Sequence, residues 1–219
     1  MRRPKTKNRQ RPAARDVKKP RWGSAVLDRN QQRHLRREAL FRTAAQAFNE
    51  SSFHTTTLAD LAARLNVTKP TLYYYVKDKD DILFECQRMA LEQMKDVLDE
   101  HRNSALTGIK KLEKFLRRYA ELMTDDFGIC LVRTGLLPLK SSSREKLLQF
   151  ARQIDHRLRE IIQGGTQDGS IREIEPHLAA NAIFGGMNGI ANWFKPEGAL
   201  TKEVMFNEYI GLFRRALLK

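Results

Sequence analysis

Apolar side chains recur every three or four residues along most of the chain, a spacing that places them on one face of an α-helix. Beyond residue 78 the pattern predicts helices over residues 80–101, 104–124, 128–137, 142–163, 176–193 and the stretch that follows a cap at Thr201. Ser142 or Ser143 can cap the fourth of these helices, which Gly164–Gly165 is expected to end. No run alternates polar and apolar residues as a strand does. The pattern therefore predicts an all-α chain.

Residues 55–75 carry the most informative local pattern, two short helices joined by a tight turn. Thr57 can cap the first helix, and Asp60 three residues later can complete a capping box. The apolar residues from Leu58 to Leu65 then share one face of that helix. Asn66 follows, and asparagine tolerates the left-handed conformation that a sharp turn needs. This arrangement predicts a helix-turn-helix.

The second helix of the pair is expected to turn an unusual set of side chains outward. Leu72 and Val76 share the face that packs on the first helix, and Thr68 can cap the helix start. The outward face and its flanks carry Lys69, Pro70, Thr71, Tyr73 and Tyr74. Lysine reads guanine edges, threonine and proline contact thymine methyl groups, and tyrosine hydroxyls bind phosphates. The alternative is an ordinary helical hairpin with surface tyrosines, because short motifs also produce false matches.

These residues resemble the TetR family of bacterial transcriptional regulators. The likeness runs in order and without gaps over residues 39–79, and its most specific part is Val67–Tyr73. Ser52 and Asn66 stand at turns where the family often has glycine. The resemblance implies an N-terminal three-helix head that binds DNA and a C-terminal helical domain for ligand binding and dimerisation.

The resemblance also implies roles for individual residues. Those nearest base edges would be Lys69, Pro70 and Thr71. Those that hold phosphates would be Thr57, Tyr73, Tyr75 and Lys79, while Tyr74 could do either. The implied partners are a partly palindromic double-stranded operator and a second copy of the chain, with two recognition helices about 34–36 Å apart.

Charge is distributed unevenly along the chain. The formal net charge is +14, and residues 1–37 hold 14 of the 40 Lys and Arg but only two acidic residues. We therefore divide the chain into a flexible basic arm (1–28), a DNA-binding domain (29–77) and a ligand-binding and dimerisation domain (78–219). The arm either lies along DNA phosphates or is a solvated tail. If the arm dominates, the protein is a nonspecific or architectural DNA-binding protein rather than a sequence-specific regulator.

The larger domain carries aromatic and soft residues that could line an effector cavity, with one polar side chain among them. They are Phe115, Tyr119, Met123, Phe127, Phe150, Phe184, Met187, Asn188 and Trp193. Each also has a plain packing interpretation, because such residues are most often part of a core. Residues 184–198 resemble a TetR subgroup that senses acyl-CoA thioesters or similar lipid catabolites. That likeness implies a repressor released from DNA by a small hydrophobic or acyl-CoA-like ligand, with no other cofactor.

The last two predicted helices have the composition of a dimerisation surface. Small residues that permit close helix approach stand at Ala182, Gly185, Gly186 and Gly189. The final helix is apolar over more than one face between Val204 and Phe213. Such a helix must be buried, either in the core of its own chain or against a partner.

The sequence contains no motif typical of an enzyme and no segment typical of a membrane protein. The five histidines are scattered, and no HExxH, GxSxG, GxGxxG or Walker sequence occurs, so neither a catalytic centre nor a metal site is predicted. No stretch reaches the roughly 18 apolar residues of a membrane span, and the N-terminus lacks the apolar segment of a signal peptide. Cys86 and Cys130 have no metal-like spacing and are expected to be buried, inert thiols in a reducing cytoplasm.

Overall fold

The computed structural model describes residues 29–100 and 104–219; the predicted basic arm, residues 1–28 with Trp22, lies outside them. Apart from one isolated β-bridge between Ile171 and Leu218, the regular structure of this part is helical, as predicted. The head consists of α1 (Arg29–Ser51), α2 (Leu58–Arg64) and α3 (Lys69–Tyr73). The body consists of α4 (Lys79–Glu100), α5 (Gly108–Leu122), α6 (Asp126–Thr134), α7 (Ser141–Gln167), α8 (Pro176–Trp193) and α9 (Lys202–Leu217).

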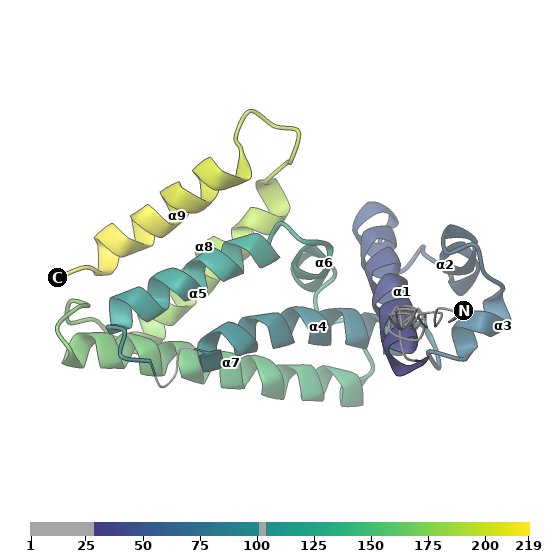
Figure 1. Ribbon diagram of the computed structural model, residues 1–219, viewed down its shortest axis with the longest axis horizontal. Helices are drawn as coiled ribbons and strands as arrows, with labels where there is room; N and C mark the ends of the chain where they lie inside the picture. Colours follow the sequence, from purple (N-terminus) through teal and green to yellow (C-terminus); the bar gives the residue numbers. More distant parts are fainter. Residues whose placement is uncertain (1–28, 101–103) are drawn as a thin grey trace, which may run out of the picture.

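Helix α1 lies between the body and the two short helices α2 and α3 (Figure 1). Its residues Ala44, Ala45 and Phe48 are buried, as their common helical face predicts. Leu61 of α2 and Leu72 of α3 are buried in the same apolar cluster. These contacts fix the orientation of α3 relative to α1.

Two turns of the head have a left-handed backbone at the positions where the family often has glycine. Ser52 has a φ of 76° and Asn66 a φ of 53°. The capping box between them forms as predicted, because Thr57 accepts from the Asp60 N–H and donates its own N–H to the Asp60 carboxylate at 2.8 Å. Thr68 stands at the N-cap of α3 as predicted, but its side chain makes no capping hydrogen bond to that helix.

Helix α4 is the central element of the body. It packs against α5, α6 and α7, and it also contacts α1 of the head (Figure 1). The Sγ of Cys86 on α4 donates to the backbone oxygen of Phe41 on α1 at 3.2 Å. Helix α9 lies at the outside of the body, where it packs against α5. The body is therefore joined to the head through α4 and α6, which both contact α1.

The start of α7 differs from its prediction. The helix begins at Ser141, and neither Ser142 nor Ser143 caps it. The Ser143 hydroxyl donates instead to the Asp80 carboxylate at 2.7 Å, and the Lys140 N–H donates to the same carboxylate at 2.6 Å. These bonds join the start of α7 to the first turn of α4.

The predicted end of α7 is also wrong, for a packing reason. The helix continues through Gly164 and Gly165 to Gln167, and the chain turns away at Gly169, where φ is 77°. A Cβ on Gly108 of α5 would lie 2.2 Å from the Cα of Gly165. The close approach of α5 to α7 therefore depends on glycine at 108, and a Cβ on Gly165 would itself lie 2.5 Å from the Ile171 side chain.

Helices α5 and α6 have different bounds from those predicted. Helix α5 begins at Gly108 and ends at Leu122, inside the predicted 104–124. Helix α6 begins at Asp126, because the Asp125 carboxylate accepts from the Phe127 N–H. It ends before Gly135, where φ is 62°, and so does not reach Pro138.

We expect Gly108→Ala to destabilise the protein by about 1–3 kcal/mol, because the added methyl group collides with the backbone of α7. Gly164→Ala is the matched control, since no atom lies within 4 Å of the Cβ that it adds. Alanine is favoured over glycine inside a helix by roughly 0.5–1 kcal/mol, so this variant should be more stable. Urea unfolding followed by circular dichroism measures both. Equal unfolding free energies for the two variants would contradict the close contact.

Candidate DNA-binding surface and ligand cavity

Helix α3 turns its polar face to solvent. Leu72 is buried, whereas Lys69, Pro70 and Thr71 are exposed, as predicted from their helical positions. Tyr73 and Tyr74 are 50% and 68% exposed. The hydroxyls of Thr68 and Thr71 hydrogen-bond each other at 2.9 Å. One short helix thus presents a cation, a hydroxyl and two aromatic rings together, which are groups that contact base edges and phosphates.

An arginine of α1 lies beside this surface. The guanidinium carbon of Arg33 is 5.5 Å from the ring centroid of Tyr74, and the half-buried Tyr75 meets Tyr74 edge-on at 5.1 Å. Arg33 is exposed and adds positive charge next to α3. It was missed from the sequence, because basic residues fill the whole N-terminal region and only the fold brings this one to Tyr74.

Two residues predicted to hold phosphates have partners inside the head. The Thr57 hydroxyl bonds the Asp60 carboxylate at 2.8 Å. The Lys79 ammonium donates to the backbone oxygens of Phe53 at 2.7 Å and of Thr56 at 3.0 Å, and it lies 4.4 Å from the centroid of the Phe53 ring. Lys79 therefore fastens the start of α4 to the loop before α2. A phosphate contact at Lys79 would require exchanging these bonds.

A cavity of about 500 Å³ lies among α4, α5, α6, α7 and α8. Aliphatic side chains make most of its wall, including Leu91 and Met94 of α4 and Leu131 and Val132 of α6. Three of the residues predicted to bind an effector also line it, namely Tyr119, Phe184 and Asn188. An apolar cavity of this size with a few polar groups is typical of a small-molecule site.

The other residues predicted to bind an effector lie outside this lining. Phe115, Met123, Phe127 and Met187 are at most 1% exposed and belong to the core. Phe150 is half-buried on α7. Trp193 is 43% exposed and stacks on Tyr209 of α9 at 5.9 Å. The packing interpretation describes Phe115, Met123, Phe127 and Met187, whose side chains fill the interior between helices.

The cavity has polar groups at three places, the third being Asn181 of α8, whose amide hydrogen-bonds His177 at 3.2 Å. The Tyr119 hydroxyl donates to Asn188 Oδ1 at 2.7 Å, and burial raises the pKa of Tyr119, so this hydroxyl keeps its proton. Arg152 and Asp155 of α7 also line the cavity. Arg152 bonds the exposed Glu145 at 2.7 Å, and Asp155 is held by Arg159. A charged pair this exposed contributes little to stability, so Arg152 is available for exchange with an anion.

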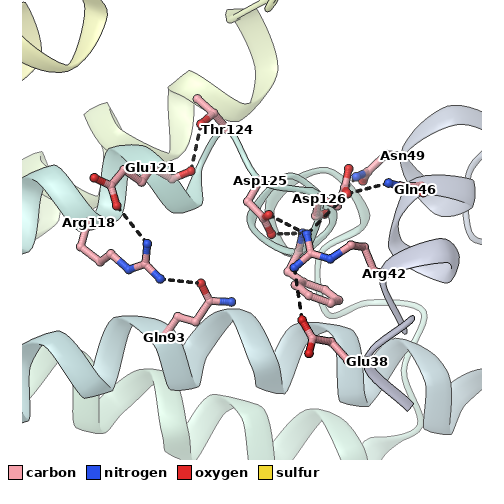
Figure 2. A network of polar contacts seen from close by, with 11 residues as sticks. Glu38, Arg42, Gln46, Asn49, Gln93, Arg118, Glu121, Thr124, Asp125 and Asp126 are labelled. Atoms are coloured by element: carbon pink, nitrogen blue, oxygen red, sulfur yellow. Dashed lines mark hydrogen bonds and ion pairs between the residues drawn. The ribbon is translucent and has the colours of Figure 1, made fainter. Parts of the chain in front are cut away.

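The first turn of α6 contacts α1 through a polar network (Figure 2). Arg42 of α1 donates to the Asp125 carboxylate at 2.8 Å, and its guanidinium carbon lies 4.8 Å from the centroid of the Phe127 ring. Gln46 donates to the Asp126 carboxylate at 2.8 Å, and Asn49 donates to the Asp126 backbone oxygen at 3.0 Å. Three successive turns of α1 therefore hold the start of α6.

The other end of α6 is held by α4. Gln87 of α4 is fully buried, and its Nε2 donates to the backbone oxygen of Gly135 at 2.7 Å. The remaining amide oxygens of Gln87 and Asn49 are buried and accept no hydrogen bond from the described residues. A buried acceptor without a partner costs about 1–3 kcal/mol. Each end of α6 is thus contacted by a side-chain amide, Asn49 at the start and Gln87 at the end, and each of these amides has one oxygen without a hydrogen bond.

Both cysteines are buried and free, as predicted. Burial raises the pKa of the Cys130 thiol to about 11 and that of Cys86 well above its usual value, so neither is a reactive thiolate at neutral pH.

In residues 29–100 and 104–219, no group of three or more His, Cys, Asp or Glu is placed to hold a metal ion. None of the helices described here is both long enough and apolar enough to cross a membrane.

A three-helix head with an exposed α3, joined to a helical body, defines a DNA-binding protein of the helix-turn-helix class. Residues 40–86 match the family described as bacterial regulatory proteins, tetR family. Residues 105–217 match the tetracyclin repressor-like C-terminal domain. The chain belongs to the TetR family of transcriptional regulators, which are not enzymes, and the resemblance seen in its sequence is confirmed.

Relatives and solved structures share this architecture. The fatty acid metabolism regulator protein of Bacillus subtilis (strain 168) is 26% identical over 146 residues, which cover 65% of this chain and 74% of that protein. The TetR family regulator PfmR from Thermus thermophilus is 26% identical with a TM-score of 0.73, over 80% of this chain and 97% of that chain. AibR, solved with isovaleryl coenzyme A and operator DNA, is 23% identical with a TM-score of 0.72, over 81% of this chain and 97% of that chain.

We expect Thr71→Ala to weaken binding at particular operator positions by about 1–3 kcal/mol, because a base contact carries sequence information. Tyr73→Phe should instead weaken binding to every sequence alike, because a phosphate contact carries none. Lys146→Ala, an exposed position on α7, is the control and should leave DNA binding unchanged. Fluorescence anisotropy at one fixed salt concentration, with operator DNA and its single-base variants, measures all three. An equal loss on operator and scrambled duplex for Thr71→Ala would refute its base contact.

Proposed function

We propose that this regulator is a homodimeric repressor that binds a partly palindromic operator and is released by a small hydrophobic or acyl-CoA-like effector in the cavity of the body. The observation that carries the proposal is the position of α6. Leu131 and Val132 of α6 line the cavity, and Asp126 at its first turn contacts α1 of the head. A ligand that moves α6 would therefore move α1 and, with it, α2, which packs against both α1 and α3. Such a regulator acts on DNA in the bacterial cytoplasm.

The polar contacts of α6 support a helix with two positions. An allosteric change needs a second arrangement whose free energy is only slightly higher than the first. The unsatisfied oxygens of Asn49 and Gln87 make the present arrangement of α6 less than optimal. A shifted α6 could satisfy them, and this lowers the free-energy difference between the two arrangements.

The chemistry of the cavity supports an amphipathic effector. Its wall is largely apolar, which suits an acyl chain, and Arg152 supplies a cation that a carboxylate or phosphate can bind. AibR, which has the same fold, was solved with isovaleryl coenzyme A. The resemblance of residues 184–198 to acyl-CoA-sensing regulators points to the same ligand class.

A stripe of small and apolar residues on the outer face of α8 supports a homodimer. Leu178, Ala182, Gly185, Gly189 and Trp193 follow one another at steps of three or four residues and are exposed or half-exposed. Exposed apolar stripes of this length mark interfaces. A two-fold axis there would set two α3 helices about 34–36 Å apart, one turn of DNA.

Helix α9 packs within its own chain and also leaves apolar side chains exposed. A Cβ on Gly186 would lie 2.9 Å from the Phe213 ring, so this part of α9 packs on α8 within the chain. Val204 and Leu212 are 47% and 57% exposed and remain available to a second copy. We assign these two side chains to the dimer surface together with α8.

The alternative, a nonspecific or architectural DNA-binding protein, depends on the basic arm. The exposed polar face of α3 and the membership of the TetR family favour a sequence-specific regulator. Phosphate contacts alone give binding that ignores sequence and weakens steeply with salt. Sequence preference at high salt therefore separates the two functions.

Fluorescence anisotropy at about physiological salt tests the proposal, using the DNA upstream of the chain's own gene and a scrambled duplex of equal length. We expect preference for the upstream DNA by several orders of magnitude. Acyl-CoAs should then release the specific complex. Equal weak binding to both duplexes, with no specific site found in the surrounding genomic DNA, would favour the architectural alternative.

We expect Arg42→Met to weaken the coupling between effector and DNA by about tenfold, within the usual size of allosteric couplings. The variant keeps an apolar side chain next to Phe127 but loses the bonds to Asp125 and Asp126. Because this pair is partly exposed, the fold should be retained. DNA anisotropy titrations with and without saturating acyl-CoA measure the coupling.

Arg118→Met is the matched control for this prediction. Arg118 is similarly exposed and bonds Glu121 and Gln93, but it lies on α5 and contacts neither α1 nor α6 in the network of Figure 2. It should leave the coupling unchanged. An unchanged coupling in Arg42→Met as well would exclude the contact of α1 with α6 as the route.

A further inference from the structure

One hydrogen-bonded pair stands out in the apolar cavity. Tyr119 of α5 is only 3% exposed, and its ring is held between Phe115 at 5.5 Å and Phe184 at 5.9 Å. Its hydroxyl points to Asn188 of α8 and donates to Oδ1 at 2.7 Å. Both side chains line the cavity, so a bound molecule would contact this pair directly.

The bond from Tyr119 fixes which end of the Asn188 amide is used. Oδ1 accepts from the tyrosine, and Nδ2 therefore faces away from it with two N–H donors. Nδ2 has no hydrogen-bond partner among residues 29–100 and 104–219, and it is not one of the polar atoms closed off from all solvent. A donor that lines an apolar cavity favours a ligand atom that accepts a hydrogen bond.

We propose that Tyr119 is a positioning residue that orients the Asn188 amide so that the cavity selects an apolar compound carrying a carbonyl oxygen. The inference rests on the proposed function, since it takes this cavity to be the effector site. An acyl group satisfies Asn188 through its carbonyl and places its chain against the aliphatic wall. A compound of the same length without the carbonyl leaves the amide N–H groups unpaired, which costs affinity.

Calorimetry with two matched compounds tests this selection directly. Decanoyl-CoA and its thioether analogue S-decyl-CoA share chain and head group and differ in the carbonyl oxygen. One neutral hydrogen bond corresponds to a factor of about ten in affinity, so we expect the thioester to bind about tenfold more tightly. Decanoate and methyl decanoate, tested in parallel, show whether the acyl group is recognised as a CoA thioester, a free acid or a neutral ester.

Variants of the pair separate orientation from simple packing. Tyr119→Phe keeps the ring but frees the Asn188 amide, so the preference for thioester over thioether should fall from about tenfold to about twofold or less. Asn188→Leu removes the donor and should abolish the preference in the same way. Tyr209→Phe removes a hydroxyl outside the cavity lining and is the control, with the preference unchanged. A purely structural role of Tyr119 would weaken both compounds equally.

The outcomes distinguish this inference from the proposed function. Binding of the thioester without release of DNA would remove the effector role and leave the selection standing. Release of DNA by thioester and thioether at equal concentrations would overturn the selection and leave the repressor mechanism standing. Failure of all four acyl and alkyl compounds to bind would overturn the inference, whatever the DNA-binding result.

Discussion

The packing of α1 against α6 is the contact on which the rest of the structure depends, because α1 packs against α2 of the head and also against α4 and α6 of the body. One side of α1 packs in the head, where Phe48 meets Phe53 edge-on at 5.3 Å. The other side bonds the body, where Arg42 donates to Asp125 at the start of α6 (Figure 2). The backbone oxygen of Phe41 also accepts from Cys86 of α4. The head has too few residues to bury much apolar surface alone. The head and the helix α6 that lines the cavity therefore both pack against α1.

The helix-turn-helix could be predicted almost completely from the sequence, because local chemistry determines it. The capping box of Thr57 and Asp60 forms within four residues. The positive φ of Asn66 could be expected because asparagine is one of the few residues that tolerate that conformation. The exception is Thr68, whose hydroxyl bonds another side chain, Thr71, in place of the backbone. A cap residue indicates where a helix starts more reliably than which bond its side chain makes.

The ends of the body helices and the lining of the cavity could not be predicted, because partners distant in sequence determine them. Gly165 stays helical where α7 packs against Gly108 of α5, and Ser143 leaves its own helix end to bond Asp80. The cavity wall consists mainly of ordinary aliphatic residues that no sequence pattern distinguishes from core. Aromatic residues of the body are the ligand contacts that the sequence favours, yet most of them fill helix interfaces. Tyr119, Phe184 and Asn188 are the residues expected from the sequence that do line the cavity.

Ser52 and Asn66 have a further consequence for the behaviour of the molecule on warming. Ser52 holds its side chain in a backbone region that costs most L-residues roughly 1–2 kcal/mol, whereas Asn66 adopts the same region at a lower cost. The two residues bracket the segment that carries α2. Lys79 fastens this segment from outside through backbone oxygens. Segments with stored strain and few buried contacts open before the global core does. The DNA-binding surface would therefore lose order at a lower temperature than the body, which gives operator occupancy a dependence on heat that needs no effector at all.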